Sequence, residues 1–206
     1  MGSGNQSTPQ PVLVVHGGAW DIPEEMRGDS VEGCQAAARA GWAVLTQGGS
    51  ALDAVETAVR ALEDDPTFDA GHGSVLNARG HIEMDAIIMD GRDLNLGAVM
   101  AVRTVRHPIT LARLVMAESE HAILAGEGAE AFARERGIAF CPSWELVVDR
   151  EAERWRAHRS QARRSEDLFE QRLAASHPCG TVGAVTIDGH GHLAAATSTG
   201  GKFSKH

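Results

Sequence analysis

The sequence has 206 residues, of which 43% are hydrophobic, and its 28 acidic and 19 basic side chains give a formal net charge of −9. A chain of this length and composition can bury a substantial core, so we expect a globular protein of one domain or slightly more. The acidic surplus argues against nucleic acids and anionic membranes as partners, and no segment approaches membrane-spanning length, which leaves small molecules or short peptides as ligands.

Residues 1–10 are small and polar and are expected to form a disordered leader. This leader has neither the basic start nor the apolar core of a secretory signal, and the three cysteines of the chain are spaced too widely for a disulfide framework. We therefore expect a cytoplasmic protein. The next segment, 11–18, reads PVLVVHGG and predicts a short apolar strand that ends in glycines.

Two helices are predicted after this strand. Apolar residues recur at helical spacing from Ser30 to Gly48, where a pair of glycines supplies the stop. The second helix begins at Ser50, which resembles the first residue of a capping box with Asp53, and it ends near Asp64.

The middle of the chain is a turn-rich stretch followed by two apolar ones. Residues 66–80 are rich in glycine and other turn formers. Residues 82–91 and 94–105 are apolar and predict two strands of a central hairpin, joined by the turn DGRD.

Two more helices and a charged segment follow the hairpin. Helical periodicity returns over 109–119, opened by a proline, and over 127–136, closed by a glycine. From 149 to 172, acids and bases alternate with few apolar residues, so this segment is either a solvated helix or a mobile linker. We interpret it as a mobile linker.

The last predicted elements are the strands TVGAVTID (181–188) and HLAAATSTGG (192–201), joined by a Gly-rich turn. Paired helices and paired strands without a regular βαβ alternation predict a layered α+β fold, in which the late strands pair with the early ones.

Four stretches occur in a distinctive order: VVHGGAW near the start, DPTFDAGHGSVLNARG with EMDAIIMDG in the middle, GTVGAV after the charged segment, and ATSTGG near the end. In this order they resemble the plant-type asparaginase and isoaspartyl peptidase family, the threonine-nucleophile branch of the N-terminal nucleophile (Ntn) hydrolases. The resemblance covers residues 12–142 and 177–201. It implies an αββα sandwich made as an inactive precursor, which cuts itself on the N-terminal side of a threonine.

By this resemblance the cut falls between Gly180 and Thr181. The chain then divides into a leader (1–10), the α-subunit region of the Ntn domain (11–142), a charged linker that ends at the cut (143–180) and the start of the β-subunit region (181–206).

The chemistry of such a cut is sound on physical grounds. Cleavage frees an α-amine on Thr181, and that amine can act as general base for the hydroxyl of the same residue. Gly180 allows the backbone conformation that attack on the preceding carbonyl requires. Without the resemblance, Thr181 reads as a β-branched residue that opens a buried strand. Thr199 matches the family's second threonine, which supports the nucleophile. The alternative interpretation is an ordinary threonine at a sheet edge.

Two further segments match loops of the family. His16, Gly17 and Gly18 match a loop whose glycines let the backbone approach the scissile region, and we assign His16 no role as a base. Asp69 stands where the family commonly has asparagine, and a carboxylate lacks the donor that an amide offers to an oxyanion. This departure puts rate or substrate preference in doubt.

The resemblance also implies a structural sodium ion, held by backbone carbonyls of a loop that would otherwise be an ordinary connection. Irregular backbone suits a hard cation, which prefers oxygen ligands. The carbonyls implied are those of Leu62, Glu63, Asp65, Phe68, Ala70 and His72. We expect no cofactor for catalysis. We also expect no transition-metal site, because a hairpin turn explains the pair His190 and His192.

The function implied is hydrolysis of β-aspartyl amide bonds, in isoaspartyl dipeptides or L-asparagine, by a homodimer of processed α/β pairs. The alternatives are a glycosylasparaginase-type amidase and a non-catalytic sandwich protein. The chain stops at GGKFSKH, before the substrate-gripping and oxyanion residues of the family, so we expect an incomplete sandwich and no hydrolysis by residues 1–206 alone.

Overall fold

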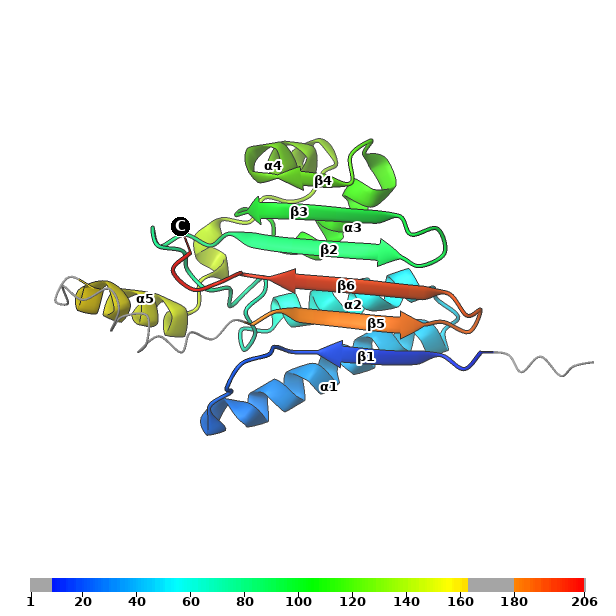
Figure 1. Ribbon diagram of the computed structural model, residues 1–206, viewed down its shortest axis with the longest axis horizontal. Coiled ribbons are helices and arrows are strands. Elements are labelled where there is room, and N and C mark those ends of the chain that lie inside the picture. The colour runs from blue at the N-terminus through cyan, green and yellow to red at the C-terminus, as the bar shows by residue number, and fades with distance from the viewer. Residues whose placement is uncertain (1–8, 163–179, 206) are drawn as a thin grey trace, which may run out of the picture.

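Figure 1 shows a computed structural model of the chain, which describes residues 9–162 and 180–205. Most of the predicted leader, the last part of the predicted linker and Cys179 lie outside these residues. The elements in chain order are β1 (Val12–His16), α1 (Glu24–Thr46), α2 (Ala51–Asp64), β2 (Met84–Asp90), β3 (Leu96–Val102), α3 (Pro108–Glu118), β4 (Ile123–Ala125), α4 (Gly126–Glu135), the 3-10 helix η1 (Ser143–Leu146), α5 (Asp149–Ala162), β5 (Val182–Ile187) and β6 (Leu193–Thr199).

The six strands form one mixed sheet in the order β1-β5-β6-β2-β3-β4. All neighbours are antiparallel except β3 and β4, which run parallel. The last two strands of the chain therefore lie in the middle of the sheet, between β1 and β2 (Figure 1). The predicted α+β class, the central hairpin of β2 and β3 and the pairing of late strands with early ones are confirmed.

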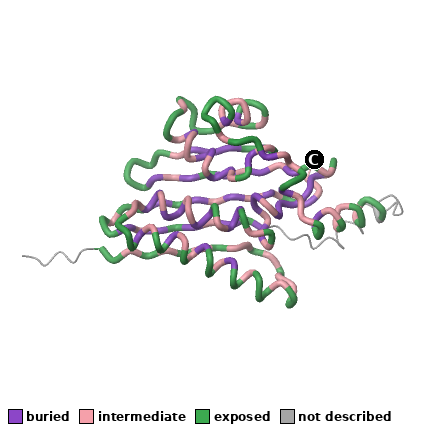
Figure 2. Tube along the Cα trace, turned by 180° about the vertical axis from the view of Figure 1, so that it is seen from behind, coloured by how far each residue is buried: buried purple, intermediate pink, exposed green. Residues whose placement is uncertain are grey.

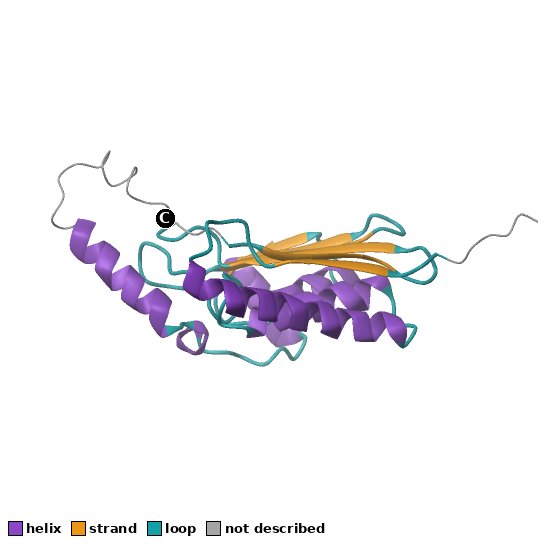
Figure 3. Cartoon of the chain, turned by 90° about the horizontal axis from the view of Figure 1, so that it is seen from below, coloured by secondary structure: helices purple, strands orange, loops and turns teal. Residues whose placement is uncertain are grey.

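Helices α1 to α3 cover one face of this sheet, as the view along the sheet in Figure 3 shows, and α5 lies beyond the end of the sheet. Alternation along β5 explains why: Val182 and Ala184 are buried toward the helices, whereas Val185 points to the other side and is 51% exposed. Buried residues accordingly concentrate between the sheet and α1 to α3 (Figure 2). The opposite face is covered by no described helix or strand.

Two helix boundaries show how local chemistry sets the elements. Helix α2 begins as predicted, because the Ser50 hydroxyl accepts a hydrogen bond from the Asp53 amide at 3.1 Å. Helix α1 begins earlier than predicted, at Glu24 instead of Ser30. Pro23 precedes it, and acidic residues in its first turn favour the positive end of the helix dipole.

The charged segment that we interpreted as a mobile linker forms helix α5 over residues 149–162, so that part of the prediction is wrong. The helix docks on the body of the protein through Trp155, whose indole N–H donates to the carbonyl of Asn77 at 2.9 Å. Glu151 on the same helix is only 5% exposed. A few contacts therefore order a helix whose overall composition is that of a solvated segment.

Candidate active site

The hydroxyl groups of Thr181 and Thr199 lie together at one end of the central strands. Val182 pairs with Ser198 in the ladder of β5 and β6, which sets the two threonines opposite each other on the face of the sheet without helices. Their Oγ1 atoms are 3.3 Å apart. Thr181 is exposed, so its hydroxyl is open to a reactant.

The Thr199 hydroxyl takes part in three hydrogen bonds of this arrangement. It donates to the carbonyl oxygen of Gly180 at 2.9 Å, accepts from the amide of Gly201 at 2.9 Å, and accepts from the Thr181 hydroxyl. One hydroxyl can make these three bonds at once. A single side chain thus connects the predicted nucleophile with the carbonyl of the predicted scissile bond.

The loop after β1 approaches the same peptide from another direction. Gly18 has φ of +139°, and a Cβ there would lie 3.7 Å from the Cα of Gly180. Gly17 is packed more tightly, since a Cβ would lie 2.5 Å from the Cys34 sulfur. The structure therefore brings Gly18 to the site and packs Gly17 against Cys34 and Phe68, while the side chain of His16 is exposed on the edge strand β1.

Asp69 packs directly against Gly180. A Cβ at position 180 would lie 2.7 Å from the Cβ of Asp69, and the Asp69 carbonyl accepts from the Gly200 amide at 2.9 Å. The carboxyl oxygen Oδ1 accepts from the Val75 amide at 2.9 Å. The other oxygen, Oδ2, is buried and has no hydrogen bond of ordinary geometry within the described chain.

This environment changes the acidity of Asp69. Burial raises the pKa of its carboxyl to about 7, and the negative charge of Glu151 also raises it. The amides of Val75 and Gly180 and the ammonium group of Lys205 act in the opposite direction. Near neutral pH the carboxyl is therefore divided between its protonated and ionised forms.

The predicted ion-binding loop folds back on the end of α2. The His72 amide donates to the Glu63 carbonyl at 2.7 Å, and a Cβ on Gly71, at φ of +53°, would overlap that carbonyl. The side chain of Glu63 is buried and accepts from the Ile109 amide at 3.0 Å, which ties the loop to α3. A second glycine, Gly73, leaves room beside the carbonyl oxygen of Phe68. The sodium ion implied by the resemblance remains a prediction for this loop, whose Glu63 carbonyl already accepts from His72.

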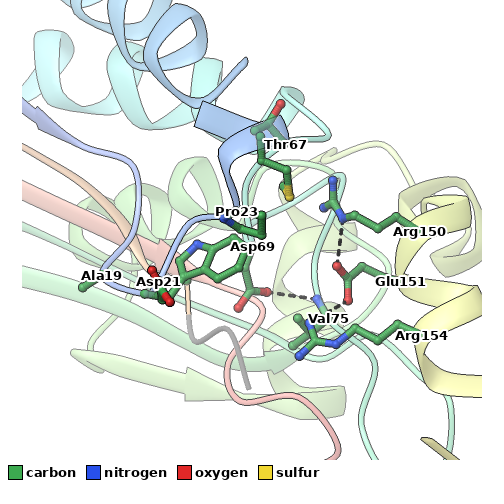
Figure 4. A pocket seen from close by; sticks show the side chains of 13 residues that line it. Ala19, Asp21, Pro23, Thr67, Asp69, Val75, Arg150, Glu151 and Arg154 are labelled. Carbon is green, nitrogen blue, oxygen red and sulfur yellow. Dashed lines mark hydrogen bonds and ion pairs between the residues drawn. The ribbon is translucent and has the colours of Figure 1, made fainter. Parts of the chain in front are cut away.

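A pocket of about 490 Å³ adjoins the site and is lined by Gly180, Asp69 and part of α5. Figure 4 shows Arg150, Glu151 and Arg154 reaching from α5 toward the pocket. Sequence reasoning missed these three residues because it placed them in a linker. The signal that was available is Trp155, a large apolar residue within the charged run.

The sequence of residues 9–206 matches the family model described as Asparaginase. The chain belongs to the asparaginase family. Its similarity to curated isoaspartyl peptidase/L-asparaginases is 50% identity over 196 residues for that of Xenopus laevis, 47% over 195 for that of Danio rerio and 46% over 196 for that of Homo sapiens. These matches cover 95% of the chain but only 61%, 61% and 62% of the relatives.

The family resemblance drawn from the motifs is thereby confirmed, and this asparaginase-family chain spans about three fifths of the length of those relatives. Within residues 9–162 and 180–205, no helix has the length and apolar character needed to cross a membrane. The same residues contain no group of three or more His, Cys, Asp or Glu side chains placed to hold a metal ion.

Proposed function

We propose that this chain is the precursor region of a threonine-type hydrolase that cuts itself between Gly180 and Thr181 and then cleaves β-aspartyl amide bonds. The observation that carries the proposal is the Thr199 hydroxyl, which contacts both the Thr181 hydroxyl and the Gly180 carbonyl oxygen. The kinship with isoaspartyl peptidase/L-asparaginases supports the choice of substrate.

In the self-cleavage step, the Thr181 oxygen attacks the carbonyl carbon of Gly180. As the attacking hydroxyl passes its proton to the Thr199 oxygen, Thr199 passes its own proton to the oxyanion that develops on the Gly180 carbonyl oxygen, and this proton later goes to the leaving amine. The C–N bond then breaks and the amine takes up a proton, which leaves an ester between Gly180 and the Thr181 oxygen. Water hydrolyses that ester and frees the N-terminal threonine.

In the hydrolytic reaction, the freed amine of Thr181 acts as base for its own hydroxyl. The hydroxyl attacks the side-chain carbonyl of the β-aspartyl group, the amine of the substrate leaves, and water resolves the β-aspartyl ester. Isoaspartyl dipeptides and L-asparagine share this β-carbonyl, so both are substrates in the proposal.

The remaining parts of the proposal concern assembly. We propose that the helix-free face of the sheet packs on a second sheet to give an αββα sandwich, and that processed pairs form a homodimer. We also propose a structural sodium ion in the 62–72 loop. The apolar side chains exposed on the helix-free face, such as Val14 and Val185, support the sandwich.

Intact-mass analysis tests the cut. The protein should yield two pieces that meet at Gly180 and Thr181, Thr181→Ala should stay whole, and Thr181→Ser should still be processed. Thr186→Ala is the matched control, because Thr186 lies on the same strand and its hydroxyl bonds to the Val12 carbonyl instead of the site. Processing of the Thr181→Ala variant at an unchanged rate would remove Thr181 as the nucleophile.

Release of aspartate from an isoaspartyl dipeptide, and of ammonia from asparagine, tests the hydrolysis against the Thr181→Ala control. The absence of turnover by residues 1–206 alone remains a prediction, which the same assay checks. Processed protein that contains the relatives' full length and still hydrolyses neither compound would favour a non-catalytic sandwich protein.

A further inference from the structure

The pocket beside Gly180 is lined largely by residues that have no role in the proposed self-cleavage reaction. The reaction needs Thr181, Thr199 and the scissile carbonyl, whereas the pocket extends away from them to α5 and to the segment between β1 and α1. Its volume of about 490 Å³ lies in the range of small-ligand sites and could hold an amino acid or a dipeptide.

The α5 wall of the pocket carries a net positive charge. Arg150 and Arg154 share one buried carboxylate, since Glu151 Oε1 lies 3.0 Å from Arg150 Nε and Oε2 lies 3.5 Å from Arg154 Nη1. On this wall two guanidinium groups face one carboxylate, while Asp21 and Asp69 line other parts of the pocket. The side chains of Arg150 and Arg154 are 41% and 24% exposed, so neither is fully buried.

These arginines are held in place by other contacts. Arg150 also donates to the Pro66 carbonyl at 3.0 Å, and the Arg154 guanidinium stacks 4.2 Å above the ring of Phe203. Guanidinium groups fixed in this way are suited to a carboxylate, whose two oxygens match the planar donor fork.

The wall formed by the rest of the lining is mainly apolar and carries two acids. Trp20, Met26 and Val75 contribute an aromatic ring, a flexible thioether chain and a branched side chain, Asp21 is exposed, and the half-buried Asp69 lies beside Gly180. A ligand that fits both walls has a carboxylate at one end and an apolar group at the other. A free amino acid or the C-terminal residue of a short peptide has this structure.

We propose that this pocket binds the amino acid or short peptide that leaves during hydrolysis, with its free carboxylate on Arg150 and Arg154 and its apolar side chain against Trp20 and Met26. The inference rests on the proposed function and refines it, because it makes isoaspartyl peptides with an apolar second residue better substrates than asparagine. Arg154 is then a specificity-determining residue on a helix that precedes the cut.

The α5 wall of this pocket does not depend on the 180–181 bond. Helix α5 is anchored by Trp155 on Asn77 and by Arg150 on Pro66, and neither contact involves that bond. The proposed cut would free Gly180, which lines the pocket next to Thr181, and would leave the α5 wall in place.

The first experiment measures binding without catalysis. In uncut Thr181→Ala protein, titration calorimetry with L-leucine, β-aspartyl-leucine and leucinamide should give binding of the first two and weaker binding of leucinamide, which lacks the carboxylate. Arg154→Gln should raise the Kd of leucine about 10-fold or more. Arg156→Gln is the matched control, because Arg156 lies on the same helix, is exposed and does not line the pocket.

The second experiment measures selectivity in processed protein that contains the relatives' full length. Arg154→Gln should lower kcat/KM for β-aspartyl-leucine about 10-fold more than kcat/KM for asparagine, and Arg156→Gln should leave the ratio unchanged. Trp20→Ala, on the opposite wall, should reduce the preference for β-aspartyl-leucine over β-aspartyl-glycine. This variant still tests the pocket if Arg154→Gln weakens the docking of α5.

Equal binding of leucine and leucinamide, or equal effects of Arg154→Gln and Arg156→Gln, would overturn the inference. These results are independent of the proposed function, since binding to the uncut variant requires no turnover. Loss of all hydrolysis with intact leucine binding would overturn the proposed function instead.

Discussion

The hydroxyl of Thr199 combines two tasks, because it donates to the Gly180 carbonyl and accepts from the Thr181 hydroxyl. Thr199→Val keeps the shape of the side chain and removes both bonds. We expect self-cleavage to slow by about 100-fold or more, the effect of losing one donor to a developing oxyanion. Intact mass followed over time measures the rate.

Thr197→Val is the control for that experiment. Thr197 lies on the same strand and face as Thr199, but its hydroxyl bonds to the Val182 carbonyl at 2.7 Å. It should cost about 1 kcal/mol of stability and change the cleavage rate by no more than a few-fold. Similar rates for the two valine variants would contradict the role of Thr199.

Asp69 makes stability depend on pH in a direction opposite to that of most acids. Its pKa is raised to about 7 in the folded chain, so the folded state holds the proton more tightly than the unfolded state. Stability is therefore lost as pH rises from about 4 to 7, and the penalty is complete above that range.

Asp69→Asn should remove this penalty. We expect the free energy of unfolding to rise by on the order of 2–4 kcal/mol at pH 8 and to change little at pH 4. Urea unfolding at the two pH values measures it, with Asp64→Asn as the control, since Asp64 is 47% exposed and its ion pair with Arg106 lies at the surface. An equal gain at both pH values would show that the Asp69 carboxyl is not the source.

At this scale the sequence predicts the two threonines of the proposed site better than their surroundings. Thr181 and Thr199 are recognisable because each lies in a short motif, and strand pairing then brings them together. The partners of Asp69 come from separate segments, Val75 on its own loop and Glu151 on α5. Their proximity depends on tertiary packing, which no local pattern encodes.

Helix α5 shows the same limit for a whole element. Its mean hydropathy is low and its amphipathic character weak, so composition indicates a solvated segment, yet one aromatic anchor docks it. Trp155→Ala should release α5 and lower the free energy of unfolding by about 1–3 kcal/mol. Faster proteolysis within 149–162 would report the release. The control is Trp144→Ala, at a side chain that is 72% exposed and should change neither quantity.

The 62–72 loop offers a test of the proposed sodium ion. A cation that binds only the folded state raises the melting temperature, and the stabilisation grows with the logarithm of its concentration above the dissociation constant. We expect a higher melting temperature in NaCl than in choline chloride at equal ionic strength. Gly71→Ala, which places a Cβ against the Glu63 carbonyl at φ of +53°, should abolish the difference. Equal melting temperatures in the two salts would remove the ion from the proposal.

On the scale of the whole molecule, the helix-free face of the sheet is the main exposed apolar surface of the described elements. Val14 and Val185 are cross-strand partners there and are 57% and 51% exposed. This chain should therefore bind an apolar dye and self-associate, and Val14→Lys combined with Val185→Glu should reduce both while keeping the fold. Sedimentation velocity and dye fluorescence measure this.

Leu94→Lys is the control for the face, because Leu94 is 68% exposed in the turn between β2 and β3. Absence of dye binding by the unmodified chain would contradict the account of this face.

The fold as a whole was more predictable than its site. Period-two alternation in β5 and β6 and helical spacing in α2 each specify an element, and the α+β class follows from their order. Strand β4 has only three residues, too few for a periodic pattern, and depends on its parallel partner β3.

The position of β5 and β6 in the sheet has a consequence for folding once the chain is cut. Both strands that follow Thr181 have a hydrogen-bonded neighbour from before the cut, β1 on one side and β2 on the other. The two pieces of the proposed cut would thus stay paired through the hydrogen bonds of these strands, without a covalent link. Before cleavage, refolding involves one chain and does not depend on dilution. After cleavage two chains must meet, so the fraction of protein that refolds would decrease as the solution is diluted. Once cut, the protein would therefore refold more slowly after denaturation than the uncut precursor.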